Sequence, residues 1–399
     1  MVLRKDVIKL PRLNSEEDGD EERHANWTEL LFDLVFVAAI SLLTLNLSRD
    51  YSFLGLVESL PLFFVIWWGW VGHTFYMSRF GTDDLLNRFL TMLQMLIVAS
   101  LAVNVRDALG STGTGFALSY AALRSILVLE YYLVGRQAPQ VQTLTNHYAL
   151  GFGIAAALWA VSAFIPAPWR FAIWGVALVI DLLTPLTASE KHLKFPPHST
   201  HLPERFGLFT IIVIGEAIVS VVFTISNIGI TIATEIAGLM GLIIAFTIWW
   251  AYFEEARGAE ARVLEAGTQI RKYQLWLYSH FPLLIGIAMV AAGIKHVLSL
   301  SLWQPMDPGE VWVLCSGLAL ALLSLSAIFF SAYRLDECKN REIHRFRLPY
   351  YVIIVLVLLT GFLGPFVPGE VILGILTILC LVKVALSFRK VTYQTCDIK

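Results

Sequence analysis

Charged residues are scarce in this sequence of 399 residues. Asp, Glu, Lys and Arg together make up 15% of it, whereas a soluble domain has about 25%. This scarcity argues against an ordinary water-soluble enzyme. The net charge of -2 offers no basic surface, so nucleic-acid binding is not expected. The chain is instead rich in apolar sequence, with 57% hydrophobic residues and a mean hydropathy of +0.68.

Cysteines and familiar catalytic motifs are also few. Cys315, Cys338, Cys380 and Cys396 have neither the spacing of a zinc site nor that of a disulfide framework. The sequence contains no Walker loop, G-x-S-x-G, H-E-x-x-H or C-x-x-C motif, so ATP-driven transport by this chain alone and familiar hydrolytic chemistry have no support. We therefore expect no cofactor and no metal, and an enzyme is the less favoured interpretation.

The start of the chain lacks the apolar core of a secretory signal. Residues 1–25 instead carry six acidic side chains between Glu16 and Glu22, which predicts a solvated tail. A docking tail for a basic partner is the less favoured alternative.

The apolar residues come in blocks of about 20, the length that crosses a bilayer core of about 30 Å. Reading these blocks between charged or Pro- and Gly-rich breaks gives twelve candidate spans. The predicted fold class is all-α: a polytopic transmembrane helical bundle of about twelve spans, with the lipid bilayer as its surroundings.

Basic residues decide the expected orientation, because Lys and Arg are retained on the cytoplasmic side of a membrane. With the N-terminus inside, the cytoplasmic segments hold 23 of the 29 basic residues, and the opposite loops hold Arg49, Arg106 and Arg170. We expect a multi-pass protein of the cell membrane with both termini in the cytoplasm.

Two halves of the chain resemble each other weakly. Phe64–Trp68 reads FVIWW and Phe246–Trp250 reads FTIWW, and each is followed by a charged loop and a long apolar span. An even number of spans would make two such copies parallel; chance similarity between apolar sequences is the alternative. The predicted division is an acidic tail at 1–25, six-span halves at 26–189 and 206–389, a cytoplasmic linker at 190–205, and a tail at 390–399.

Ionisable residues within the spans are the main functional candidates, because a charge near the bilayer centre costs at least about 2.5 to 3.5 kcal/mol. In the first span, Asn26 can cap the helix, and Glu29 can close a capping box. Asp33 lies about 6 Å deeper, beyond the reach of capping, and is expected to face a cavity or a cation. For Glu29, capping and a functional role are equally open.

Glu216 is the most deeply placed acid, about 16 Å beyond Arg205 along its span. Arg124 lies about 15 Å from the cytoplasmic end of its own span, so an ion pair between Arg124 and Glu216 is geometrically possible. A purely structural bridge is the alternative to a role in binding a substrate or proton.

Four further candidates lie in the cytoplasmic thirds of their spans: His73, Glu130, Asp181 and His280. For the histidines, a neutral ring hydrogen-bonded inside the bundle is the commoner case, although histidine can also relay protons. Asp181 precedes Pro185, where carbonyl groups freed by the proline would help to bind a cation.

Trp27–Val37 and His201–Glu216 are two long and specific sequence segments. Both resemble the signature segments of the bacterial low temperature requirement A family, and the resemblance extends from about His24 to about Arg389. It implies a multi-pass bacterial membrane protein linked by name to growth in the cold, with no established reaction. Leu31 stands where an aromatic residue is expected. The motif residues map onto Glu29, Asp33, Pro203, Glu204, Arg205 and Glu216.

Together these observations favour a secondary transporter of a small solute or ion, with a site near the midplane between the two halves. Glu216 would carry the coupling proton or cation, Arg124 would bind an anionic group or tune Glu216, and Asp33 would form part of a cytoplasmic gate. The alternatives are a membrane-embedded enzyme or lipid-handling protein, and a non-transporting sensor or scaffold.

Overall fold

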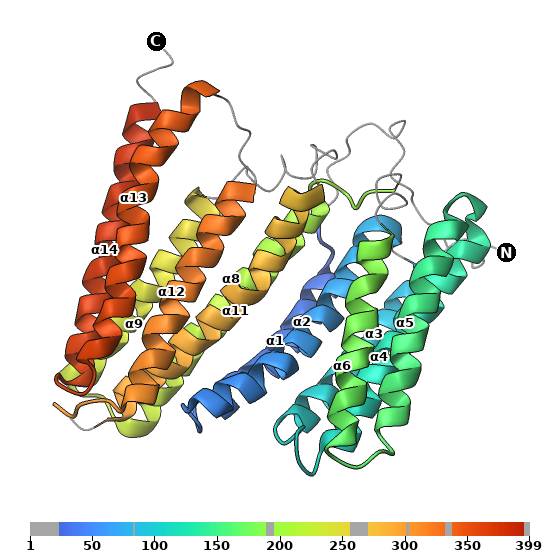
Figure 1. Cartoon of the computed structure of the whole chain (residues 1–399), viewed down its shortest axis with the longest axis horizontal. Helices are drawn as coiled ribbons and strands as arrows, with labels where there is room; N and C mark the ends of the chain where they lie inside the picture. Colours follow the sequence, from blue (N-terminus) through green and yellow to red (C-terminus); the bar gives the residue numbers. More distant parts are fainter. Residues whose placement is uncertain are drawn as a thin grey trace. The chain divides into compact units, whose positions relative to one another are not determined.

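The computed structural model describes residues 24–82, 84–188, 195–255, 270–300, 303–331 and 337–394. Within these ranges the chain forms twelve α-helices and no β-strand, which confirms the predicted all-α class (Figure 1). The predicted acidic tail at 1–25 lies outside the described residues except for its last two positions. The helices are α1 (Trp27–Leu47), α2 (Phe53–Phe80), α3 (Leu85–Val105), α4 (Gly113–Gln137), α5 (Gln142–Ser162), α6 (Trp169–Thr187), α8 (His201–Ile228), α9 (Ile232–Trp250), α11 (Ile270–Ser299), α12 (Pro308–Ser331), α13 (Glu337–Thr360) and α14 (Gly369–Gln394).

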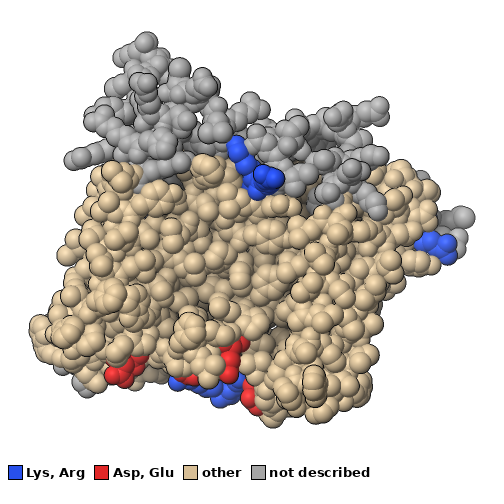
Figure 2. Space-filling model, in the orientation of Figure 1, with Lys and Arg blue, Asp and Glu red and all other residues tan. Residues whose placement is uncertain are grey.

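Ten of the helices in the described ranges are long and apolar enough to cross a membrane. The other two are α5, which begins with the polar residues Gln142, Asn146 and His147, and α13, whose apolar part is limited to Leu348–Leu363. Figure 2 shows charged side chains near the edges of the drawn face and an uncharged surface between them. This distribution is typical of a helical membrane protein.

Polar residues fix several helix starts. The Asp84 carboxylate accepts a hydrogen bond from the Asn87 backbone N–H at 2.8 Å and so caps α3. At the start of α9, Thr231 and Thr234 exchange hydrogen bonds in a capping box, at 3.2 and 2.9 Å. These caps satisfy backbone donors that have no partner within the helix.

The chain divides into two compact units. Unit 1 contains residues 1–43 and 60–209, and unit 2 contains residues 44–59 and 210–399. The last turn of α1 and the first two turns of α2 belong to unit 2, and the first two turns of α8 belong to unit 1. The division into two six-span halves stays a prediction.

Aromatic packing forms much of the core of unit 1. Tyr131 of α4 stacks on Tyr148 of α5 with ring centroids 5.0 Å apart, and it meets Tyr76 of α2 edge to face at 5.4 Å. Such pairs add about 0.5 to 1.5 kcal/mol beyond their buried area. They hold together the helices that carry the polar residues described below.

Small residues bring α11 and α12 into backbone contact in unit 2. A side-chain carbon added at Gly286 would lie 2.7 Å from both the Gly317 carbonyl oxygen and the Ala321 nitrogen. Gly293 is equally close to Leu314. Close approach of helices through small residues is typical of packing in membranes, where lipid offers no hydrophobic driving force.

Candidate functional site

The start of α1 has the predicted capping box. The Asn26 side-chain oxygen accepts from the Glu29 backbone N–H at 2.8 Å, and Glu29 Oε2 accepts from the Asn26 N–H at 3.0 Å. The Glu29 side chain is only 1% exposed, however. A capping carboxylate on a helix end is normally solvated, so a second set of partners must keep this one buried.

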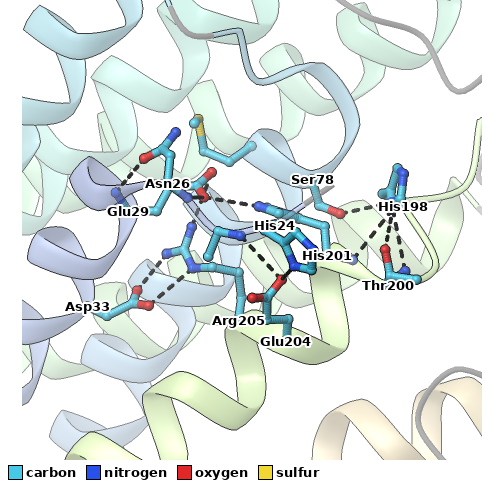
Figure 3. A network of polar contacts seen from close by, with 12 residues as sticks. His24, Asn26, Glu29, Asp33, Ser78, His198, Thr200, His201, Glu204 and Arg205 are labelled. Carbon is cyan, nitrogen blue, oxygen red and sulfur yellow. Dashed lines mark hydrogen bonds and ion pairs between the residues drawn. The ribbon is translucent and has the colours of Figure 1, made fainter. Parts of the chain in front are cut away.

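Those partners come from the first two turns of α8 (Figure 3). His201 Nε2 lies 3.0 Å from Glu29 Oε2, and Arg205 Nη1 lies 3.4 Å from Glu29 Oε1. Arg205 also makes a bidentate contact with Asp33. Its Nη2 lies 2.5 Å from Oδ1, and its Nε lies 3.1 Å from Oδ2. A bidentate pair of this kind is the strongest ionic contact available between side chains. Asp33 therefore faces a cation, as the sequence predicted.

Asp33 has a third partner in α2. The indole Nε1–H of Trp70 donates to Asp33 Oδ1 at 2.6 Å. The Trp70 ring stacks on Phe209 with centroids 4.1 Å apart and meets Phe206 edge to face at 4.8 Å. The indole is thus held by α8, the same helix that supplies the cation for Asp33.

A loop histidine places the start of α8. His198 Nδ1 accepts from the backbone N–H groups of Thr200 and His201 at 3.4 and 3.5 Å, and so takes the role of a helix cap. The His198 backbone N–H donates to the Ser78 hydroxyl near the end of α2, at 3.1 Å. The Glu204 carboxylate is directed toward His24 in Figure 3, with Oε2 3.4 Å from His24 Nδ1, and it accepts from the Ala25 N–H at 3.2 Å.

The charges of this cluster do not balance if its histidine is neutral. Glu29, Asp33, His201 and Arg205, called the end cluster below, are each 0 to 1% exposed. Two carboxylates then face a single guanidinium, which leaves one buried negative charge. A net buried charge is costly, and one proton held by His201 and Glu29 removes it. The end cluster is therefore electrically neutral when it holds one such proton.

Arg124 has a different partner from the one the sequence suggested. Its Nε lies 3.0 Å from Asp181 Oδ2, and its Nη2 donates to the Tyr120 hydroxyl at 2.7 Å and to the Trp68 carbonyl at 3.1 Å. The predicted ion pair with Glu216 gives way to this pair with Asp181, and Glu216 lies on the part of α8 that belongs to unit 2.

Carbonyl groups freed by Pro185 were expected to help bind a cation beside Asp181; in the structure the Asp181 carboxylate itself meets the guanidinium of Arg124. α6 runs through Pro185 without ending, and the Thr184 carbonyl accepts from His147 Nε2 at 3.0 Å if that nitrogen carries the proton. The Tyr120 hydroxyl also donates to Asp181 Oδ2 at 2.9 Å. Arg124 and Asp181, 1% and 0% exposed, form a balanced pair.

Glu216 is only partly covered by other side chains of the protein. Its side chain is half-buried on α8, whereas the neighbouring Ile214 and Ala217 are buried. Ile214, Ala217, Val221, Ile248 and Ile294 are among the residues that line a small apolar pocket of about 10 Å³, and Glu216 is not one of them. Glu216 still lies within a span of mean hydropathy 2.5, so it remains an intramembrane acid.

The two candidate histidines within spans have opposite surroundings. His280 is buried with Nδ1 2.8 Å from the Trp276 carbonyl and Nε2 3.0 Å from the Tyr252 hydroxyl. A carbonyl can only accept, so Nδ1 carries a proton, and both ring nitrogens are hydrogen-bonded. His73 stacks on Phe32 at 3.9 Å, and neither of its ring nitrogens has a hydrogen-bond partner in the described part of the chain.

Sequence reasoning did not select His201 as a site residue and named Arg205 only as a residue of a family motif; it also did not select Trp70 or Gln94. A signal for the first two was present: His201 and Arg205 are four residues apart, as are Glu29 and Asp33. Residues four apart lie on one face of a helix, so two acids on one helix can meet two basic groups on another. In the ranges that the structure describes, no group of three His, Cys, Asp or Glu is placed to hold a metal ion.

Comparison with known proteins gives one family and one relative. The profile of the family described as "Bacterial low temperature requirement A protein (LtrA)" matches residues 24–386. A protein of Rhizobium meliloti (strain 1021), named "Uncharacterized protein RA0937", is 28% identical over 291 residues, which cover 69% of this chain and 70% of the relative. No solved structure matches.

Proposed function

Since the chain belongs to the bacterial low temperature requirement A family, we propose that it is a proton-coupled secondary transporter of a small solute or ion. It would lie in the bacterial inner membrane with both termini in the cytoplasm, and the family name links it to growth in the cold. The end cluster carries this proposal, because four fully buried ionisable groups hold a charge that one proton balances.

The end cluster is also well placed to act as a gate. α1 and α8 both begin at the cluster in unit 1, and both continue into unit 2, from Thr44 and Thr210 onward. Loss of the proton would leave a buried negative charge, which favours a conformation in which water reaches the carboxylates. The two helices would carry that change along their length. Glu216 on α8 is the proposed second carboxylate for the coupling proton or cation.

Flux measurements on reconstituted protein test the proposal. Proteoliposomes with an internal pH-sensitive dye would be given a pH gradient and a panel of amino acids, organic acids, Na⁺ and K⁺. We expect at least one solute to accelerate proton flux in the wild type and Asp33→Asn to abolish the acceleration. Asp307→Asn, the same change at an exposed position before α12, should have no effect. A wild type that moves protons with none of these solutes would overturn the proposal.

A non-transporting membrane sensor or scaffold is the second candidate, and the Arg124–Asp181 pair favours it. This pair is balanced and dry, as expected of a fixed bridge between helices. A sensor predicts that the end cluster responds to bilayer composition or temperature without any solute flux. A membrane enzyme is favoured less, because groups 0 to 1% exposed are not open to a lipid substrate.

A further inference from the structure

Three buried polar side chains on adjacent helices of unit 1 are left with unsatisfied atoms. They are His73 of α2, Gln94 of α3 and Glu130 of α4, each 1% exposed. Gln94 Nε2 donates to Glu130 Oε1 at 2.9 Å. Among the described residues, Glu130 Oε2, Gln94 Oε1 and both nitrogens of His73 have no hydrogen-bond partner. Nearly all buried polar atoms in proteins are satisfied, so such a group points to a function.

The three side chains form a chain of neighbours that ends at the end cluster. The His73 ring is close enough to Gln94, Glu29 and Arg205 to interact with each of them. It also packs against Phe32, which precedes Asp33 on α1, with ring centroids 3.9 Å apart. Gln94 is thus a neighbour of both Glu130 and His73, and His73 is a neighbour of the end cluster.

Among the described residues, no cation balances the charge of Glu130. The groups that interact with it are Gln94 of α3 and the phenols of Tyr76 and Tyr131, which are all neutral at physiological pH. The buried cation of α2, Arg79, interacts with Tyr131 and Tyr148 instead. An ionised carboxylate buried with one amide donor is costly, whereas the protonated acid carries no charge and gains a donor of its own.

We propose that Glu130 is a proton-binding site inside unit 1, and that His73 exchanges its proton with the end cluster. On release, the O–H bond of Glu130 breaks, its electron pair stays on the carboxylate, and an N–H bond forms on a neutral His73. His73 then passes a proton from its other nitrogen toward Glu29 and His201. This inference depends on the proposed function only in naming the proton as the coupling ion.

Infrared difference spectroscopy tests the site without any transport assay. Wild-type protein in proteoliposomes at neutral pH should show the carbonyl stretch of a protonated carboxylic acid, and ¹³C-labelled glutamate should shift it. Glu130→Gln should remove this band. The matched control is Glu235→Gln, the same change at an exposed position at the start of α9, which should retain it. A wild type without the band, or a Glu130→Gln protein that keeps it, would overturn the proposal.

Two further variants keep the test decisive. If Glu130→Gln does not fold, Glu130→Asp replaces it in the test. The band would then come from an aspartic acid, so ¹³C-labelled glutamate should no longer shift it. A band that labelled glutamate still shifts contradicts the assignment. His73→Phe preserves the stacking on Phe32 and should keep the band while slowing its loss after a jump to alkaline pH by at least about tenfold. Unchanged kinetics would refute the role of His73. Because these signals are independent of solute flux, a failed uptake assay would leave the proton site standing.

Discussion

Two buried ionic sites in the described part of unit 1 differ in charge balance. Arg124 and Asp181 are one cation and one anion, supported by the Tyr120 hydroxyl. The end cluster has two carboxylates, one guanidinium and a histidine. Both are as dry as the apolar core around them.

This difference separates a fixed contact from one that can change. A balanced pair has nothing to gain from taking up or releasing a proton near neutral pH, so it serves to hold α4 against α6. An unbalanced cluster changes its net charge with one proton, and burial makes that change costly enough to move helices. Burial alone therefore does not identify a functional site, and the charge count does.

The largest expected effect comes from breaking the balanced pair. Asp181→Asn leaves the Arg124 guanidinium buried without a counter-charge and should lower the free energy of unfolding by about 3 to 5 kcal/mol. Denaturant titration in mixed micelles measures the change. The double variant Arg124→Met with Asp181→Leu should restore most of the loss, because a well-packed apolar pair can replace a buried ion pair. If the double variant is as unstable as Asp181→Asn, the unpaired charge of Arg124 is not the cause of the lost stability.

Removing one neutral donor from the end cluster should have a smaller effect. Trp70→Phe deletes the indole N–H that donates to Asp33 and keeps an aromatic ring against Phe209. A hydrogen bond to a charged group contributes about 1.5 to 3 kcal/mol, and the same titration should show a loss in that range. No loss would mean that Arg205 alone satisfies Asp33.

Neutralising one acid of the end cluster sharpens the comparison most directly. Glu29→Gln leaves Asp33 and Arg205 as a balanced pair, and the new amide oxygen can still accept from Asn26 and His201. We expect a loss of about 1 kcal/mol, well below that of Asp181→Asn. Equal losses in the two variants would contradict the unbalanced charge count of the end cluster.

The smallest effect is expected at an exposed carboxylate. Ser111 donates to Asp107 through its hydroxyl at 2.5 Å and its backbone N–H at 2.7 Å, and these bonds hold the pKa of Asp107 below its ordinary value. Because the pKa of Asp107 is lower in the folded turn than in the unfolded chain, its carboxylate stabilises the turn at pH values above the pKa of the unfolded chain. This stabilisation is lost as the pH falls through the pKa of the folded turn. Hydrogen exchange at Ser111 should therefore accelerate in acid. Asp107→Asn should accelerate it at neutral pH too, without a measurable change in global stability.

Sequence reasoning succeeded where local rules decide the outcome. The twelve predicted spans correspond in number to the twelve described helices, ten of which are long and apolar enough to cross a membrane, and the bonds between Asn26 and Glu29 follow from their spacing at a helix start. The depth of Asp33 predicted a cavity or a cation beside it, and the structure shows a cation. Which cation it meets depends on how α1 packs against α8, and no local pattern specifies that.

Depth along a helix was a poor guide to ionic partners. Arg124 and Asp181 were placed at different levels by counting from the ends of their spans, yet they are in contact. α4 has 25 residues and α6 has 19, so their ends do not mark a common plane, and the long arginine side chain spans the remaining difference. The half-buried state of Glu216 was missed for a similar reason, because depth does not tell which face of a helix meets its neighbours.

The division of α1 and α2 between the units also matters for biogenesis. The Tyr51 hydroxyl, in the segment of unit 2 that joins these helices, donates to the Ala292 carbonyl, 241 residues further along the chain. At a synthesis rate of about 5 to 20 residues per second, Tyr51 leaves the ribosome on the order of ten to fifty seconds before Ala292 does. During that interval the first hairpin must wait in the translocon or the lipid with its partner unmade, which makes this stage of synthesis a natural point for an insertion chaperone to act.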